Sequence, residues 1–145
     1  MTILKTLWIA AMVWSFASMA EADRRIALVI GNGDYLQVGP LDNPSNDAAE
    51  IADALAALDF TVTLIRDANL PIFRAAVAQF GRDLRAAGPE VTGLFFYAGH
   101  AVQSFGTNYL LPTDTVVTDA ADLDLVAVEA GAILRQMSSA KNRTN

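Results

Sequence analysis

The sequence predicts an α/β fold in which a mostly parallel sheet carries helices on its faces. Three apolar segments of strand length alternate with two segments of helical periodicity, and this alternation is typical of right-handed crossovers between parallel strands. The 145 residues suffice for one domain, and a hydrophobic content of 53% excludes a disordered chain.

The three predicted strands have clear ends. The first lies within Arg25–Asn32 and is apolar on both faces, as expected of a buried parallel strand; it closes in Gly31-Asn32-Gly33. The second, Phe60–Ile65, is rich in β-branched and aromatic residues. The third covers Thr92–Ala98 and ends directly before Gly99-His100.

Two helices are expected between these strands. Asn43-Pro44 marks the start of the first, Asn69 with Pro71 marks the start of the second, and Gly88-Pro89 ends the second. The expected apolar stripes are Ile51, Leu55 and Leu58 in the first helix and Phe73, Val77, Phe80 and Leu84 in the second.

The pattern is less regular beyond the third strand. Asn108–Pro112 is expected to be extended, Asp119–Leu125 to be an acidic loop, and Lys141–Asn145 to be a polar turn. Ala127–Ser139 predicts a third helix with apolar positions Val128, Ile133, Leu134 and Met137. By the alternation a further strand is due next, so we expect residues 23–145 to form a partial domain that lacks the later strands.

The first 22 residues have the pattern of a secretory signal peptide. Lys5 precedes the apolar run Leu7–Trp14, which is too short for a comfortable membrane span of about 20 residues. Ser18-Met19-Ala20 and Ala20-Glu21-Ala22 both fit a small-x-small cleavage rule. We expect cleavage after Ala20 or Ala22 and an exported protein, periplasmic or secreted; an uncleaved N-terminal anchor is the alternative.

Charge and composition exclude several kinds of partner. The net charge is −6 and basic clusters are missing from the sequence, which argues against nucleic acid, because binding to phosphate depends on Lys and Arg. The 145 residues contain no cysteine, hence no disulfide framework and no thiol nucleophile. One histidine among scattered acids lacks the spacing of metal ligands, so neither a metal nor a cofactor is expected.

His100 is the leading candidate for chemistry. It follows a buried strand and a glycine, at the carboxyl edge of the sheet where open parallel sheets gather their functional residues. An imidazole with a pKa near 6.5 suits general acid and base work at neutral pH. A hydrogen-bonded structural histidine is the alternative.

Asp47 is a second candidate. It lies four residues before Ile51 and eight before Leu55, so the helix is expected to carry it on the apolar face, at the same sheet edge as His100. A carboxylate on a buried face needs a partner. Either a ligand-facing role or an interaction with the helix dipole accounts for an acid in this first turn.

The Gly31-Asn32-Gly33 loop suggests a dinucleotide site only weakly. Position 36 holds Leu36 in place of the third glycine, and a long loop follows instead of a helix, so the pyrophosphate cradle is incomplete. The sequence also has no Gly-x-Ser-x-Gly elbow and no P-loop.

Two segments resemble bacterial caspase-like peptidases. The first comprises Arg25–Asn32 with Tyr35 and continues in Leu41–Ala48. The second is the histidine block, which holds Phe96–His100, Gln103, Gly106, Asn108–Pro112 and Asp114. The resemblance extends from about Arg25 to Asn145. The group that the sequence resembles comprises caspases, paracaspases, metacaspases and bacterial orthocaspases. The resemblance implies a three-layer α/β sandwich around a mostly parallel sheet.

The resemblance implies a cysteine-type endopeptidase that acts on proteins or peptides without a cofactor. In that group a histidine, here His100, works with a cysteine thiolate that attacks the peptide carbonyl. In that group the cysteine lies about 50 residues downstream of the histidine; counted from His100, it would fall just beyond Asn145. Ala101 stands where the group usually has glycine, and its backbone N–H would help form the oxyanion hole. Asp47 matches an acidic position that helps form a pocket for Arg or Lys before the scissile bond.

Two other functions stay open. A non-catalytic pseudo-peptidase or protein-binding scaffold with the same fold is favoured by Ala101 and by the lack of cysteine in this sequence. A nucleotide-binding α/β domain depends on the incomplete Gly31-Asn32-Gly33 loop alone.

Overall fold

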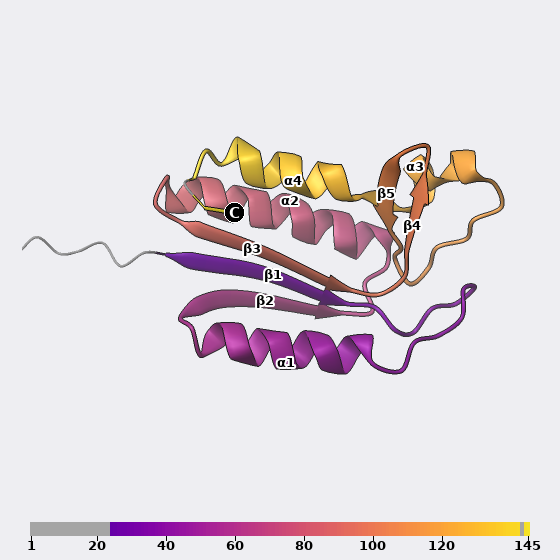
Figure 1. The fold of residues 1–145 in the computed structure, drawn as a ribbon, viewed down its shortest axis with the longest axis horizontal. Coiled ribbons are helices and arrows are strands. Elements are labelled where there is room, and N and C mark those ends of the chain that lie inside the picture. The colour runs from indigo at the N-terminus through magenta and orange to yellow at the C-terminus, as the bar shows by residue number, and fades with distance from the viewer. Residues whose placement is uncertain (1–23, 143) are drawn as a thin grey trace, which may run out of the picture.

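The chain alternates strands and helices in the predicted order up to Ala98 (Figure 1). A computed structural model describes residues 24–142 and 144–145. The strands are β1 (Arg25–Gly31), β2 (Phe60–Arg66), β3 (Thr92–Ala98), β4 (Ala101–Ser104), β5 (Thr107–Leu110) and β6 (Val128–Glu129). The helices are α1 (Pro44–Ala56), α2 (Leu70–Ala87), the 3₁₀ turn η1 (Ala120–Asp122), α3 (Leu123–Val126) and α4 (Ala130–Ser139).

The main sheet is parallel with strand order β2-β1-β3. Arg25 of β1 aligns with Phe60 of β2 and with Thr92 of β3, so all three strands end at one edge of the sheet. The central strand β1 is buried from Ala27 onward, which explains why its apolar run does not alternate. The predicted α/β class is confirmed.

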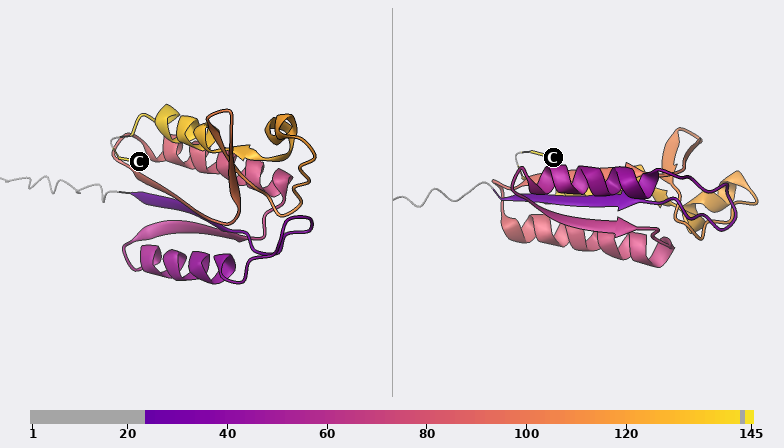
Figure 2. Two further views of the ribbon diagram at one scale, coloured as in Figure 1. Left: turned by 45° about the vertical axis from the view of Figure 1, so that its right-hand side comes forward. Right: turned by 90° about the horizontal axis from the view of Figure 1, so that it is seen from below.

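Helices cover both faces of this sheet and complete the three-layer sandwich. Alternate residues of β1 point to opposite faces: Ala27 and Val29 pack in the cluster that contains α1, whereas Leu28 and Ile30 pack in the cluster that contains α2 and α4. Figures 1 and 2 show α1 alone on one side and the α2–α4 pair on the other.

The predicted helix signals act as expected in α2. The Asn69 side chain accepts a hydrogen bond from the Ile72 N–H at 3.0 Å and so caps the first turn. Gly88, at φ 91°, follows the last helical residue, a conformation that glycine adopts readily. The four residues of the predicted stripe are all buried: Phe73, Val77, Phe80 and Leu84.

The stripe of α1 differs from the prediction. Its buried residues are Pro44, Ala48, Ala52 and Leu55, and the helix ends at Ala56. Leu58 lies in the turn beyond the helix and is 57% exposed. Small alanines let α1 approach the sheet closely, and a pattern search that weighs large apolar side chains overlooks them.

The segment after β3 folds into a second, antiparallel sheet with order β4-β5-β6, which the sequence predicted only in part. The expected extended piece contains most of β5, but β4 was missed. The expected acidic loop holds η1 and α3, with the Asp119 side chain capping the turn. The last helix begins at Ala130 because Val128–Glu129 pairs with β5, and Leu134 is 62% exposed on it.

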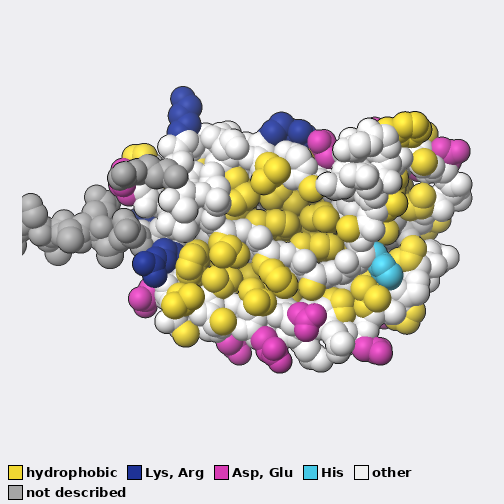
Figure 3. All heavy atoms as spheres, viewed as in Figure 1, with side chains coloured by type: hydrophobic (Ala, Val, Ile, Leu, Met, Phe, Trp, Pro, Cys, Tyr) yellow, Lys and Arg dark blue, Asp and Glu magenta, His cyan; other side chains and the backbone are white. Residues whose placement is uncertain are grey.

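Strand β3 forms one edge of the main sheet. An apolar groove of about 480 Å³ lies between this edge and α4, lined in part by Leu94, Ile133 and Met137. Figure 3 shows hydrophobic side chains gathered on this face. Thr144 lies against the start of β3: it bridges Thr92 in parallel orientation, and its carbonyl accepts the Gly93 N–H at 3.0 Å.

The expected signal peptide, residues 1–22, lies outside the described residues. Among the residues that are described, no helix is long and apolar enough to span a membrane.

Candidate active site

His100 lies two residues beyond the end of β3, at the edge where β1 and β2 also end. Its side chain, cyan in Figure 3, reaches the molecular surface. The ring nitrogen Nε2 lies 2.7 Å from the carbonyl oxygen of Gly39, in the long loop between β1 and α1. A carbonyl only accepts, so Nε2 must donate. In the neutral ring Nδ1 is then the basic nitrogen.

Tyr35 holds the backbone and the ring of His100 together. The Tyr35 hydroxyl accepts the His100 N–H at 2.8 Å, and the two ring centroids lie 4.7 Å apart at an interplanar angle of 59°. Tyr35 is only 6% exposed. A rigid aromatic beneath the imidazole and a carbonyl at its edge together limit the positions that the ring can adopt.

A second tyrosine extends this arrangement. The hydroxyl of Tyr97, on β3, lies 3.0 Å from that of Tyr35, and its single O–H is shared between the carbonyls of His100 and Leu111, both at 2.9 Å. Burial, and the hydrogen bond to Tyr35, raise the pKa of Tyr97 far above its usual 10.0. Burial also raises the pKa of Tyr35. Both phenols are therefore neutral donors at physiological pH.

Gly99 has to be glycine in this arrangement. A Cβ at this position would lie 2.5 Å from the Tyr97 hydroxyl and 2.6 Å from the Tyr35 hydroxyl. Its φ of 157° also lies in a region that side chains disfavour. The glycine before the histidine therefore serves the packing of the two tyrosines.

Asn32 connects the loops that follow β1 and β2. Its fully buried side chain accepts the Ala68 N–H at 2.8 Å and donates to the carbonyls of Ala68 and Leu111, at 3.3 and 3.2 Å. Its own N–H donates to the Ala98 carbonyl at 2.9 Å. Asn32 thus holds the loops of the site in place, because a buried amide whose donors and acceptor are engaged is costly to displace.

Contacts of the loop after β1 explain the glycines that had suggested a nucleotide site. A Cβ on Gly31 would lie 2.3 Å from the Pro44 carbonyl, so Gly31 allows the start of α1 to pack against β1. The Asp67 carboxylate accepts the N–H groups of Gly33 and Asp34, both at 2.9 Å. A protein carboxylate already occupies the donors that would hold a phosphate, and this removes the basis of the nucleotide hypothesis.

Ala101, the expected oxyanion donor, begins β4 and is exposed. Within the described residues, positive φ at non-glycine positions is confined to Asp59, Asp67, Phe105 and Lys141. Alanine is therefore accommodated after His100 without left-handed backbone, and it still carries an N–H.

Asp47 lies in the first turn of α1, as predicted, but its side chain is exposed. The expectation that it shares the buried face was wrong, because Pro44, Ala48 and Ala52 form that face instead. Close packing of Gly31 against Pro44 brings the start of α1 to the sheet edge that also carries His100. An exposed carboxylate at this edge is accessible to a ligand.

Sequence reasoning missed Gly39 and Tyr97. Gly39 lies in a loop without periodicity, and its contribution is a backbone carbonyl that no residue type announces. Tyr97 occupies an apolar strand, where an aromatic residue is more simply explained as core packing. A buried tyrosine hydroxyl requires a partner, and that requirement was the available signal.

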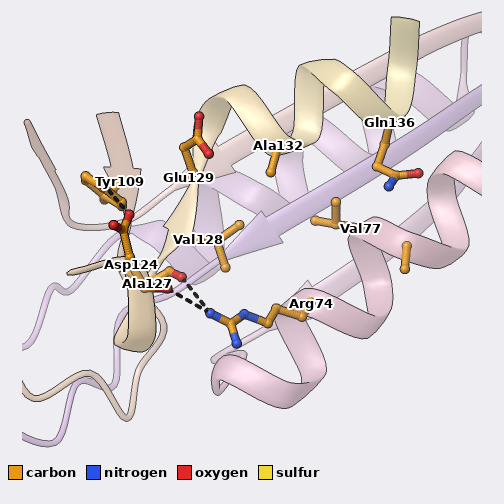
Figure 4. A pocket seen from close by; sticks show the side chains of 10 residues that line it. Arg74, Val77, Tyr109, Asp124, Ala127, Val128, Glu129, Ala132 and Gln136 are labelled. Atoms are coloured by element: carbon orange, nitrogen blue, oxygen red, sulfur yellow. Dashed lines mark hydrogen bonds between the residues drawn. The ribbon is translucent and has the colours of Figure 1, made fainter. Parts of the chain in front are cut away.

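A separate pocket of about 300 Å³ lies between α2 and α4 (Figure 4). Arg74 reaches across it, with Nη2 3.4 Å from the carbonyl oxygens of Asp124 and Ala127. The Asp124 carboxylate also accepts the Tyr109 hydroxyl at 2.6 Å. The polar groups of this pocket hydrogen-bond one another and so mainly join α3 to α2. The pocket is separate from the His100 site.

Comparison with known proteins identifies the family of the chain. The family model described as caspase domain matches residues 24–137. The human "Mucosa-associated lymphoid tissue lymphoma translocation protein 1" is 36% identical over 93 residues, which is 64% of this chain and 11% of the human protein. Its mouse homolog is 34% identical over the same shares. The chain thus spans about a ninth of these relatives. It belongs to the caspase-domain family and carries a caspase-like peptidase fold.

Proposed function

We propose that this domain is the histidine-bearing portion of a cysteine endopeptidase that cuts proteins after Arg or Lys. The observation that carries the proposal is the fixed imidazole: Nε2 bonds the Gly39 carbonyl at 2.7 Å, which leaves Nδ1 of His100 as the base. A base oriented by a third group is the arrangement that nucleophilic catalysis requires.

The nucleophile in this proposal is a cysteine from polypeptide outside the 145 residues, which contain none. Its thiolate attacks the scissile carbonyl carbon to give a tetrahedral oxyanion, which accepts a hydrogen bond from the Ala101 N–H. The His100 imidazolium passes its proton to the leaving nitrogen, the C–N bond breaks, and a thioester remains. His100 then takes a proton from water, which hydrolyses the thioester and frees the thiolate.

Asp47 is the proposed recognition group for the residue before the scissile bond. Its exposed carboxylate, at the start of α1, is free to accept charge-assisted hydrogen bonds from a guanidinium or an ammonium group. Such a pair favours Arg and Lys and repels Asp, so the substrate preference follows from the sign of the charge.

The test is hydrolysis of fluorogenic peptide amides by the polypeptide as its gene encodes it. Peptides ending in Arg or Lys should be cut, those ending in Asp or Leu should not, and His100→Ala should abolish cleavage. Asp47→Asn should reduce kcat/KM for Arg peptides at least roughly tenfold, as loss of a charge-assisted pair predicts. Glu50→Gln, which removes another exposed acid of the same helix, is the matched control.

Three results would contradict the proposal. Cleavage after Asp would overturn the role of Asp47, and full activity in His100→Ala would overturn the role of the histidine. A gene product that cleaves none of these peptides would favour the pseudo-peptidase, a function that the lack of cysteine in these 145 residues supports.

We also propose that the protein is exported through residues 1–22. N-terminal sequencing of the product made in its own host should find a chain that begins at Glu21 or Asp23. A product that begins at Met1 or Thr2 would show that the segment is retained.

A further inference from the structure

Among the described residues, strand β4 pairs with β5 alone and so forms a free edge of the small sheet; it begins directly after His100. The three residues Ala101, Val102 and Gln103 are all exposed. An exposed edge strand offers unpaired backbone groups to another extended chain. Because this edge begins next to the histidine, a chain bound along it would lie close to His100.

Two observations agree on which backbone groups of β4 face this edge. The Leu111 N–H donates to the His100 carbonyl at 3.0 Å, so this carbonyl points toward β5 as in a hydrogen-bonded pair, although the His100 N–H donates to the Tyr35 hydroxyl. Such pairs alternate along an antiparallel ladder, so Ala101 and Gln103 fall in the pairs between them. The Gln103 and Asn108 side chains, directly opposite, lie close enough for a 3.0 Å hydrogen bond.

The N–H and C=O groups of Ala101 and Gln103 therefore point away from β5 and toward the free edge. The first of these groups, the Ala101 N–H, is also the proposed oxyanion donor. A substrate carbonyl that accepts from Ala101 begins the pairing pattern that an added strand continues at Gln103.

The turn of the β4–β5 hairpin contains Phe105, a residue that folding does not favour at this position. Phe105 is 95% exposed and has φ 47°, and the following Gly106 has φ 79°. Two positive φ values define the type I′ turn, in which Asn-Gly is preferred. Phenylalanine in this conformation is strained and buries almost no surface in return. Binding would explain an aromatic residue here, since folding does not.

We propose that the outer edge of β4, from Ala101 to Ser104, binds the substrate segment that follows the scissile bond as an added strand. In this arrangement Phe105 and Val102 contact its side chains. The inference rests on the proposed function: the histidine gives its proton to the leaving nitrogen, so the strand that grows from His100 lies on the leaving side.

Length and charge define the segment that this edge accepts. Four residues at about 3.3 Å each give room for roughly four substrate residues beyond the scissile bond. No Asp, Glu, Lys or Arg occurs from Ala101 to Leu110. The surface therefore favours an uncharged, β-branched leaving segment over a charged one.

Binding is measured on the 145-residue chain, which lacks a cysteine and is expected to leave peptides intact. The probe is an acetylated peptide with Arg followed by Val-Thr-Val-Thr-amide, compared with a peptide amidated directly after Arg. The longer peptide should bind at least roughly tenfold more tightly, because it adds backbone hydrogen bonds and apolar contacts. In ¹⁵N spectra the amides of Ala101 and Gln103 should shift on binding.

Two variants separate binding from folding. Phe105→Asn creates the preferred Asn-Gly turn, so the melting temperature should rise while affinity for the longer peptide falls roughly threefold to tenfold. Gln103→Pro removes an outward N–H and spares the β4–β5 ladder, so affinity should fall as well. Asn108→Ala, on the opposite strand β5, loses the bond to Gln103 and keeps both outward N–H groups of β4, so it should bind normally.

Unchanged affinity in both Phe105→Asn and Gln103→Pro would overturn the inference, as would amide shifts confined to the edge of β3. Failure of this inference is distinguishable from failure of the proposed function. Cleavage by the gene product without shifts in β4 leaves the peptidase and removes this docking strand. Binding on β4 without any cleavage supports the docking strand and removes the peptidase.

Discussion

The hydroxyl of Tyr35 accepts the backbone N–H of His100 at 2.8 Å while its ring lies against the imidazole. One side chain thus fixes both the backbone and the ring of the histidine. Because the Gly39 carbonyl holds the far edge of that ring at 2.7 Å, the imidazole is oriented before any substrate binds. Orientation before binding lowers the cost of reaching the transition state.

Tyr35→Phe should loosen His100 without unfolding the domain. The ring contact survives, but the His100 N–H loses its acceptor and the Tyr97 hydroxyl loses one of its partners. We expect a loss of about 1–2 kcal/mol of stability and exchange broadening of the imidazole resonances. Since the sequence has one histidine, its NMR signals are unambiguous.

Tyr109→Phe is the matched control for this variant. Tyr109 is also buried and also donates its hydroxyl, but to Asp124 and not near His100. Its removal should lower stability by a similar amount and leave the imidazole signals sharp. Equal broadening in both variants would show that Tyr35 acts through general stability alone.

Alkaline pH should destabilise the domain. Burial raises the pKa of Tyr97 above its unfolded value of 10.0, so the folded state retains a proton that the unfolded state releases. This stability is fully present below about pH 10 and is lost as the pH rises above it. Urea unfolding from about pH 8 to about pH 11 measures the slope, and Tyr97→Phe should flatten it. A slope unchanged in Tyr97→Phe would contradict this assignment.

Gly99→Ala should be among the most damaging small substitutions. Its Cβ would meet two tyrosine hydroxyls at 2.5 and 2.6 Å, so the loss should reach about 3 kcal/mol. Gly39→Ala is the contrast, because a Cβ there would meet no described atom within 4 Å beyond its own chain neighbours. This variant should change stability by less than about 0.5 kcal/mol. Thermal unfolding of both variants distinguishes crowding from a general intolerance of alanine.

Leu134→Lys should reduce self-association. Leu134 is 62% exposed and lines the apolar groove beside the β3 edge, a surface that favours association of like chains. Light scattering should decrease, with an unchanged circular dichroism spectrum. Leu125→Lys, at a position that is 70% exposed on α3, should have less effect. If both variants scatter equally, net charge and not the groove governs association.

The main sheet and its helices were predictable because each has a local cause. Continuous apolar runs gave β1 and β3, and Asn69 with Gly88 bounded α2. The small sheet was not predictable from the same signals. Strand β4 is exposed from Ala101 to Gln103, so it has no buried face to produce alternation. Its turn, Phe105-Gly106, has phenylalanine where Asn-Gly would have marked a hairpin.

The site was predictable in its histidine and not in its supports. The position of His100 directly after an apolar strand and a glycine marks it as a candidate. Its supports come from distant segments, Gly39 by a carbonyl and Asn32 by contacts to Ala68 and Leu111, and pairings of this range carry no periodic signal. Asp47 was placed in the correct turn on the wrong face, because alanines formed the stripe.

An imidazole oriented by Gly39 is tested most directly by the tautomer of neutral His100 in the 145-residue chain. The ¹⁵N shifts of the imidazole report which nitrogen carries the proton. The geometry with Gly39 predicts a proton on Nε2 and a free, basic Nδ1, and Gly39→Ala should preserve this because the carbonyl is backbone. A proton mainly on Nδ1, or an even mixture of tautomers, would contradict an imidazole oriented for proton transfer.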